Sequence, residues 1–130
     1  MGVIKNKEEL KFAIIGAGHG GTAMAGHLSL LGFDVSLYNR TAERIQIIQH
    51  SGGIEILSDQ NSIPQGFASL NVITSDLEEA VRDRDVLMVV LPATGHLSIA
   101  ENLAPFLKDD QIIVLNPGRT GGALEVLNTI

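Results

Sequence analysis

The sequence contains no cysteine, no tryptophan and a single tyrosine among its 130 residues. The absence of cysteine excludes disulfide bonds, thiol nucleophiles and cysteine-ligated metal sites together. Positive charge is also scarce, because 9 lysines and arginines stand against 15 acidic residues, for a formal charge of -6. We therefore expect no general attraction to nucleic acid or to anionic membranes. Any anionic ligand must be held by local geometry.

Long apolar runs are missing as well. No run approaches the roughly 18 residues that a membrane-spanning helix needs, and the first ten residues carry too many charges for a signal peptide. We expect a cytoplasmic protein without a membrane partner. The chain has the length of one domain, and its four dispersed histidines predict no metal site.

Short apolar runs alternate along the chain with segments of helical periodicity. The runs are rich in Val, Ile and Leu on successive residues, which is typical of parallel strands buried on both faces. The predicted strands are 12–15, 35–38, 72–74, 86–91 and 112–115. Right-handed crossovers then predict an α/β fold, a Rossmann-type doubly wound parallel sheet with strand order 3-2-1-4-5.

The segments between the strands carry helix start and stop signals. Predicted helices cover 21–31, 41–51, 75–81 and 94–104, with Thr41 as cap of the second and a capping box of Ser75 and Glu78 at the third. Between 53 and 70 we expect a short irregular hairpin or an extended insertion. A last helix from about 121 is predicted to be incomplete, within a single domain that covers 1–130.

The first predicted strand is followed by a GxGxxG motif that leads into a helix. In such a loop, Gly16 makes the tight turn, Gly18 lets the backbone approach a pyrophosphate, and Gly21 allows close packing of helix on strand. With His19 and Gly20 these residues form the predicted phosphate-binding loop, where free N–H groups at a helix start hold the phosphates. The alternative is a glycine turn with a purely structural role.

The second predicted strand ends at Tyr38 and is followed by Asn39, Arg40 and Thr41. An NAD site usually has Asp or Glu here to accept from the ribose 2'-hydroxyl, and FAD and S-adenosylmethionine sites also tend to use an acid. Arg40 can instead pair with a 2'-phosphate, with Asn39 and Thr41 as further hydrogen-bonding groups. We predict NADP (NADPH) over NAD. The alternative is an exposed arginine beside a helix cap.

Two further loops are predicted at the same edge of the sheet. The fourth strand ends in Leu91, Pro92 and Ala93, where Pro92 presents an apolar edge to a nicotinamide ring. His96 follows as a candidate catalytic residue, with a surface or capping role as the alternative.

The fifth strand leads into Asn116, Pro117 and Gly118, which we predict to approach the cofactor or the substrate closely through the backbone. Arg119 is available for a substrate carboxylate. The alternative is a flexible loop that leads to a helix.

Three motifs resemble the octopine/nopaline (opine) dehydrogenase family: GAGHGG at 16–21, LPATGH at 91–96 and LNPGRTGGALE at 115–125. The resemblance covers nearly the whole chain from about Phe12 and implies an N-terminal NAD(P)-binding domain. Enzymes of this family condense an amino acid with an alpha-keto acid and reduce the imine with NAD(P)H. The resemblance further implies that Asn39 and Arg40 face the adenosine ribose, and that Pro92 and 116–118 approach the nicotinamide.

The sequence departs from this family by lacking a counterpart to its second, mostly helical domain, to which the family's acid/base pair belongs. We therefore expect the chain to be truncated and nearly inactive alone, with its catalytic residues elsewhere. The surface that packs on the second domain in this family would then be uncovered, which would favour self-association. The candidate residues of this apolar surface are Leu124, Val126, Leu127 and Ile130.

Alternatives remain open. A free-standing NAD(P)-binding or sensing module is one. The cofactor domain of a ketopantoate-reductase-like or glycerol-3-phosphate-dehydrogenase-like enzyme is another. The first of these enzyme families carries a lysine after the fourth strand, and the second a Lys-Gly signature after the fifth; both signatures are missing here.

Overall fold

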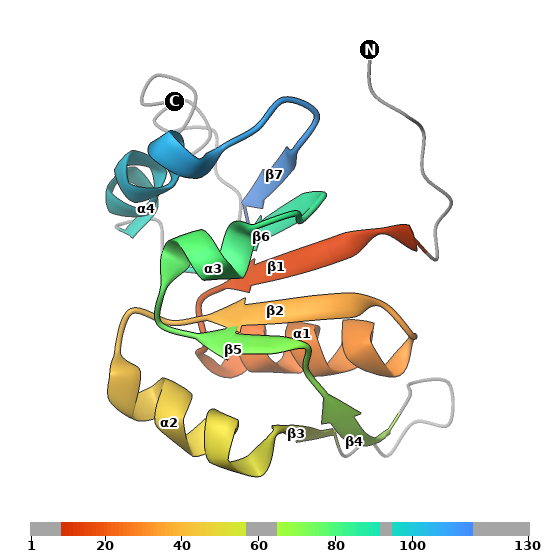
Figure 1. Ribbon diagram of the computed structural model, residues 1–130. Helices are drawn as coiled ribbons and strands as arrows, with labels where there is room; N and C mark the ends of the chain where they lie inside the picture. Colours follow the sequence, from red (N-terminus) through yellow and green to blue (C-terminus); the bar gives the residue numbers. More distant parts are fainter. Residues whose placement is uncertain (1–8, 57–64, 92–94, 116–130) are drawn as a thin grey trace.

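The computed structural model describes residues 9–56, 65–91 and 95–115. Its main feature is a parallel sheet of strand order β5-β2-β1-β6-β7, shown in Figure 1. The strands are β1 (Lys11–Ile15), β2 (Asp34–Tyr38), β5 (Val72–Thr74), β6 (Val86–Val89) and β7 (Ile112–Leu115). Counted along the chain this is the predicted order 3-2-1-4-5. The predicted fourth strand is two residues too long, because it ends at Val89 and not at residue 91.

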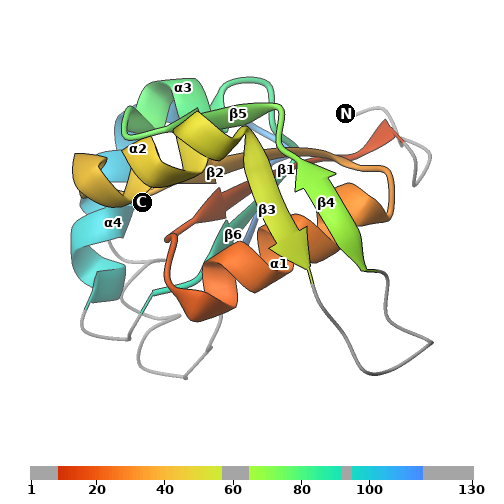
Figure 2. The ribbon, with the colours of Figure 1, turned by 90° about the horizontal axis from the view of Figure 1, so that it is seen from below.

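Helices cover both faces of the sheet (Figures 1 and 2). α1 (His19–Leu30) and α2 (Ala42–Ser51) lie on one face, and α3 (Leu77–Val81) and α4 (His96–Leu103) lie on the other. A 3-10 turn, η3 (Ala104–Phe106), follows α4. Because neighbouring side chains of a strand point to opposite faces, Ile14 packs under α1 and α2 while Ala13 and Ile15 pack under α3 and α4. This explains the continuous apolar runs.

The predicted capping box at the start of α3 is wrong. The cap is Asp76, whose carboxylate accepts from the backbone N–H groups of Glu78 and Glu79 at 3.1 and 3.5 Å. An ionised oxygen at a helix N-terminus also gains from the helix dipole, which a serine hydroxyl does not. Thr41 does occupy the cap position of α2, but its side chain makes no capping hydrogen bond.

Of the two alternatives predicted for 53–70, the hairpin is confirmed, and its described strands pair in regular register. β3 (Gly53–Ile56) pairs antiparallel with β4 (Gly66–Ser69), and residues 57–64 lie outside the described ranges. The hairpin packs on α1, as Figure 2 shows. A side chain at Gly26 in α1 would lie 2.5 Å from the Ile56 side chain, and the Ser29 hydroxyl donates to the Ser69 carbonyl at 2.6 Å. The glycine inside α1 therefore allows the close approach of the hairpin.

Within the described ranges, no helix is both long enough and apolar enough to cross a membrane.

Candidate functional site

The glycine-rich loop joins β1 to α1 at the carboxyl end of the sheet. Gly16 has φ +121°, and a Cβ there would lie 2.4 Å from the Val90 carbonyl oxygen. A Cβ at Gly21 would lie 1.7 Å from the Gly16 carbonyl oxygen. Both positions therefore require glycine for folding. The shortest contact at Gly21 is with the main chain of the loop, and the Cβ would also lie 3.7 Å from the Ile14 side chain of β1, in line with the predicted close packing of helix on strand.

Gly18 differs from these two glycines. It precedes α1 with φ -77° and ψ -169°, a conformation that other residues adopt readily. A Cβ at this position would meet nothing within 4 Å. The fold therefore does not require glycine at residue 18, and the space in front of it is open.

The first turn of α1 contains the other two predicted loop residues. His19 opens the helix and is exposed, and a Cβ on Gly20 would lie 3.3 Å from a Val90 methyl group. No described side chain caps the start of this helix, and its first turn holds no acidic residue. Its N-terminal N–H groups would thus present the favourable end of the helix dipole to an anion that binds there.

Side chains of the segment after β2 hold the loop in place. The Ala17 N–H donates to Asn39 Oδ1 at 3.2 Å, and the Ala17 carbonyl accepts from the Arg44 guanidinium at 2.9 Å. The Gly16 N–H donates to the Tyr38 carbonyl at 2.8 Å. A role for Arg44 was not predicted from the sequence. A cation in the first turn of a helix opposes the helix dipole, and this could have indicated a specific role.

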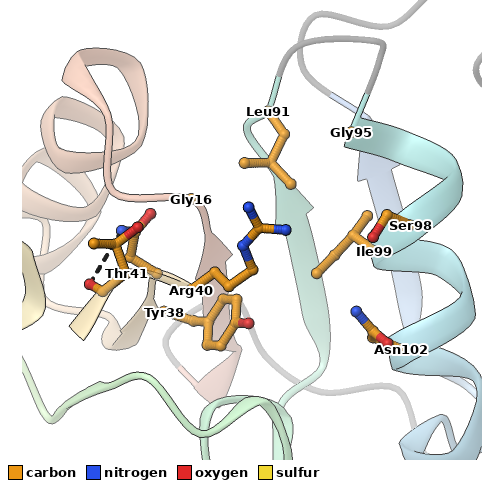
Figure 3. Close-up of a pocket in the computed structure, with 10 residues that line it drawn as sticks. Gly16, Tyr38, Arg40, Thr41, Leu91, Gly95, Ser98, Ile99 and Asn102 are labelled. Carbon is orange, nitrogen blue, oxygen red and sulfur yellow. Dashed lines mark hydrogen bonds between the residues drawn. The ribbon is translucent and has the colours of Figure 1, made fainter.

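A cavity of about 430 Å³ lies between this loop and α4, shown in Figure 3. The exposed Arg40 side chain extends into it from the end of β2, and no described residue forms a hydrogen bond or an ion pair with Arg40. Ser98 and Asn102, which the sequence analysis missed, lie one turn apart on α4 and line the opposite side; that i, i+4 spacing of polar residues was the available signal. The lining residues are Gly16, Tyr38, Asn39, Arg40, Thr41, Leu91, Gly95, Ser98, Ile99 and Asn102.

A second cavity of about 520 Å³ lies where the start of α1 meets α2. It is lined by Gly18, His19 and Arg44, among others, and Thr41 borders both cavities. The structure thus brings the predicted residues of the glycine loop together with Asn39, Arg40, Thr41 and Leu91.

Other predicted site residues lie outside the described ranges. These are Pro92, Ala93, Asn116, Pro117, Gly118 and Arg119, together with the apolar candidates Leu124, Val126, Leu127 and Ile130. His96 is the first residue of α4, and its side chain is likewise not described. In the described part of the chain, no three His, Cys, Asp or Glu residues gather as a metal site would require.

Tyr38 gives this site a spectroscopic probe. Its pKa lies above the ordinary value of 10.0 because burial disfavours the phenolate; Arg40 opposes this shift and Asp76 adds to it. The fold favours the neutral phenol, so this contribution to stability is complete below pH 10.0 and is lost as the pH rises through the folded-state pKa.

We expect Arg40→Ala to raise the pKa of Tyr38 further, because the opposing positive charge is removed. The chain has one tyrosine and no tryptophan, so an ultraviolet titration of the folded protein reports this group alone. A lower titration midpoint in the variant would contradict the proximity of the two side chains.

Comparisons with known proteins agree with this geometry. The family model of the N-terminal domain of NAD-dependent glycerol-3-phosphate dehydrogenase matches residues 11–119. An opine dehydrogenase from Arthrobacter sp. (strain 1C) is 42% identical over 118 residues, which cover 91% of this chain and 32% of the relative. A glycerol-3-phosphate dehydrogenase [NAD(P)+] from Acinetobacter baumannii is 28% identical over 117 residues, which cover 88% of this chain and 31% of the relative.

Among solved structures, octopine dehydrogenase with NADH and L-arginine superposes with a TM-score of 0.80 at 23% identity. The alignment covers 92% of this chain and 31% of that one, and it shows a common fold. The chain thus spans about a third of the length of these relatives. The predicted resemblance to opine dehydrogenases is confirmed. The match over residues 11–119 shows that this chain belongs to the family of NAD-dependent glycerol-3-phosphate dehydrogenase N-terminal domains, and among its relatives stands an opine dehydrogenase that is 42% identical to it.

Proposed function

We propose that this chain binds NADP(H) as the cofactor domain of an opine-dehydrogenase-like oxidoreductase. The observation that carries the proposal is the open space at Gly18. At residues 16 and 21, backbone conformation or a close main-chain contact requires glycine. At residue 18 neither reason applies, and the space that a side chain would fill is open to a molecule outside the fold. That molecule must approach the uncapped start of α1, where N–H groups and the helix dipole favour a diphosphate.

The residues after β2 favour binding of a ribose that carries a 2'-phosphate. Residues 39–41, directly after Tyr38, include no carboxylate, whereas Arg40 lies in the cavity beside Gly16 without a partner in the described ranges. A guanidinium can form two parallel hydrogen bonds to a phosphate. Asn39 uses its amide oxygen on Ala17 and its amide nitrogen on the Thr41 carbonyl, so Arg40 is the principal candidate for this phosphate.

The cavity in front of α4 has the character of an adenosine site. Leu91 and Ile99 supply apolar surface, and Ser98 and Asn102 supply hydrogen-bonding groups. An adenine ring placed here would lie between the end of β2 and α4. The ribose would then be close to Arg40, and the diphosphate would reach the glycine loop.

The similarity to the Arthrobacter enzyme supports a reductive condensation of an amino acid with an alpha-keto acid. The two substrates would lose water to form an imine. A reduced nicotinamide cofactor, with its diphosphate held at the start of α1, would supply the hydride for the imine carbon, and the imine nitrogen would take up a proton. Leu91 lines the cavity. The proposed contacts of the nicotinamide are Pro92 and Ala93, which come next in the chain, together with residues 116–118. Arg119 is the proposed partner of a substrate carboxylate, and His96 is a candidate for proton transfer.

Titration of the chain with NADPH and with NADH, by calorimetry or cofactor fluorescence, tests this function. We expect saturable 1:1 binding of both cofactors, with NADPH binding more tightly. In a steady-state assay with NADPH, pyruvate and a panel of amino acids, the chain alone should show little turnover, because its relatives are about three times longer. Absence of heat and of fluorescence change with both cofactors would overturn the proposal.

A glycerol-3-phosphate-dehydrogenase-like activity is the second candidate, favoured by the family model that matches residues 11–119. Because little turnover is expected of the chain alone, the comparison uses the low residual rates: glycerol 3-phosphate with the oxidised cofactor against pyruvate and amino acids with NADPH. A rate above background with glycerol 3-phosphate only would favour this second function.

A further inference from the structure

The peptide group between Ala17 and Gly18 decides where the Gly18 N–H points. A trans peptide is planar, so its carbonyl and its N–H point in opposite directions. The Ala17 carbonyl accepts from Arg44 on α2 at 2.9 Å, which turns the Gly18 N–H away from the Arg44 guanidinium. The direction of one predicted phosphate donor is thus set by a side chain of another helix.

The neighbouring peptide group is held in the same way. The Ala17 N–H belongs to the peptide that links Gly16 and Ala17, and it donates to Asn39 Oδ1 at 3.2 Å. Ala17 itself is 1% exposed, so its polar main-chain groups lie in poorly solvated surroundings and need partners within the protein. Asn39 and Arg44 therefore hold the two peptide groups on either side of Ala17.

Without these partners the loop would have more than one conformation. Gly18 has no Cβ and lies exposed, and even an added Cβ would meet nothing within 4 Å, so sterics at this residue restrict the preceding peptide little. A glycine next to a free peptide group allows that group to turn over at low cost. Gly18 thus leaves room for a ligand, but it also leaves the preceding peptide group free to rotate unless other residues hold it.

We propose that Arg44 is a positioning residue that, with Asn39, fixes the peptide before Gly18 and so preorganises the diphosphate-binding loop. This inference rests on the proposed cofactor binding. Arg44 and Arg40 then differ in role although both are exposed and four residues apart. The Arg44 guanidinium donates to a main-chain carbonyl, whereas Arg40 lines the other cavity and has no protein partner in the described ranges. Restraining a loop in its bound conformation raises affinity because less conformational freedom is lost on binding.

The test compares Arg44→Met with the wild type. We expect the variant to bind NADPH and NADH about tenfold more weakly, by an equal factor, because the diphosphate is common to both cofactors. In the ligand-free variant, nuclear magnetic resonance should show faster exchange of the Ala17 amide and conformational exchange at Gly18. Arg44→Lys should recover part of the affinity, because its ammonium group also donates a hydrogen bond.

Arg82→Met is the matched control, because it removes the same charge from an exposed arginine that pairs with Glu78 at 3.4 Å on the opposite face of the sheet. This control should leave both affinities unchanged. A loss in Arg44→Met confined to NADPH would overturn the inference and indicate contact with the 2'-phosphate. Unchanged affinity, or a lower melting temperature with unchanged affinity, would also overturn it. If the wild type itself binds neither cofactor, the proposed function fails together with this inference.

Discussion

Gly18→Ala is expected to remove most cofactor binding and to leave the stability of the chain almost unchanged. The added methyl group fits the free protein, since nothing lies within 4 Å and the backbone conformation suits alanine. It would, however, occupy the space through which a diphosphate reaches the start of α1. Loss of one or two charge-assisted hydrogen bonds, at about 1.5–3 kcal/mol each, corresponds to at least tenfold weaker binding.

Gly21→Ala provides the contrast. Its methyl group would lie 1.7 Å from the Gly16 carbonyl oxygen, so the main chain of the loop must move. Overpacking of this kind costs about 1–3 kcal/mol. This variant should therefore unfold at lower temperature and also bind poorly. Thermal unfolding and NADH titration of both variants separate the effect on stability from the effect on binding. Wild-type NADH affinity in Gly18→Ala would show that the diphosphate does not lie over this residue.

Arg40→Ala is expected to weaken NADPH binding by about 1.5–3 kcal/mol and to change NADH binding little. The reason is that the two cofactors differ by the 2'-phosphate alone, and in the described part of the chain Arg40 has no partner that competes for its guanidinium. The side chain is exposed, so its loss should not destabilise the fold.

Calorimetric titration of wild type and variant with both cofactors checks this selectivity at fixed ionic strength. Arg82→Met again controls for the change in net charge. An equal loss for NADPH and NADH would refute the assignment of Arg40 to the 2'-phosphate. Increased NADH affinity in the variant would, by contrast, agree with it, because a ribose with a free 2'-hydroxyl gains nothing from a nearby cation.

Much of the fold follows from local patterns. Apolar runs of three to six residues predict buried parallel strands, and right-handed crossovers in a Rossmann-type sheet then give the order 3-2-1-4-5, which the structure has. The glycine spacing likewise predicts the loop between β1 and α1. The strands and the glycine loop depend on residues that are close to one another in the chain. Their physical cause can therefore be read from the sequence.

Residues that meet across the fold were not predictable in this way. The hydrogen bond from Arg44 to Ala17 joins positions 27 residues apart, and Gly26 meets Ile56 only because the hairpin lies on α1. Ser98 and Asn102 reach the cavity of Arg40 because the crossover brings α4 to the edge where β2 ends. The sequence by itself determined the elements, their order and the loop that can receive a phosphate, because these follow from periodicity and backbone sterics. The tertiary structure alone decided which side chains hold that loop and which face its ligand, because those contacts exist only after distant segments have packed together.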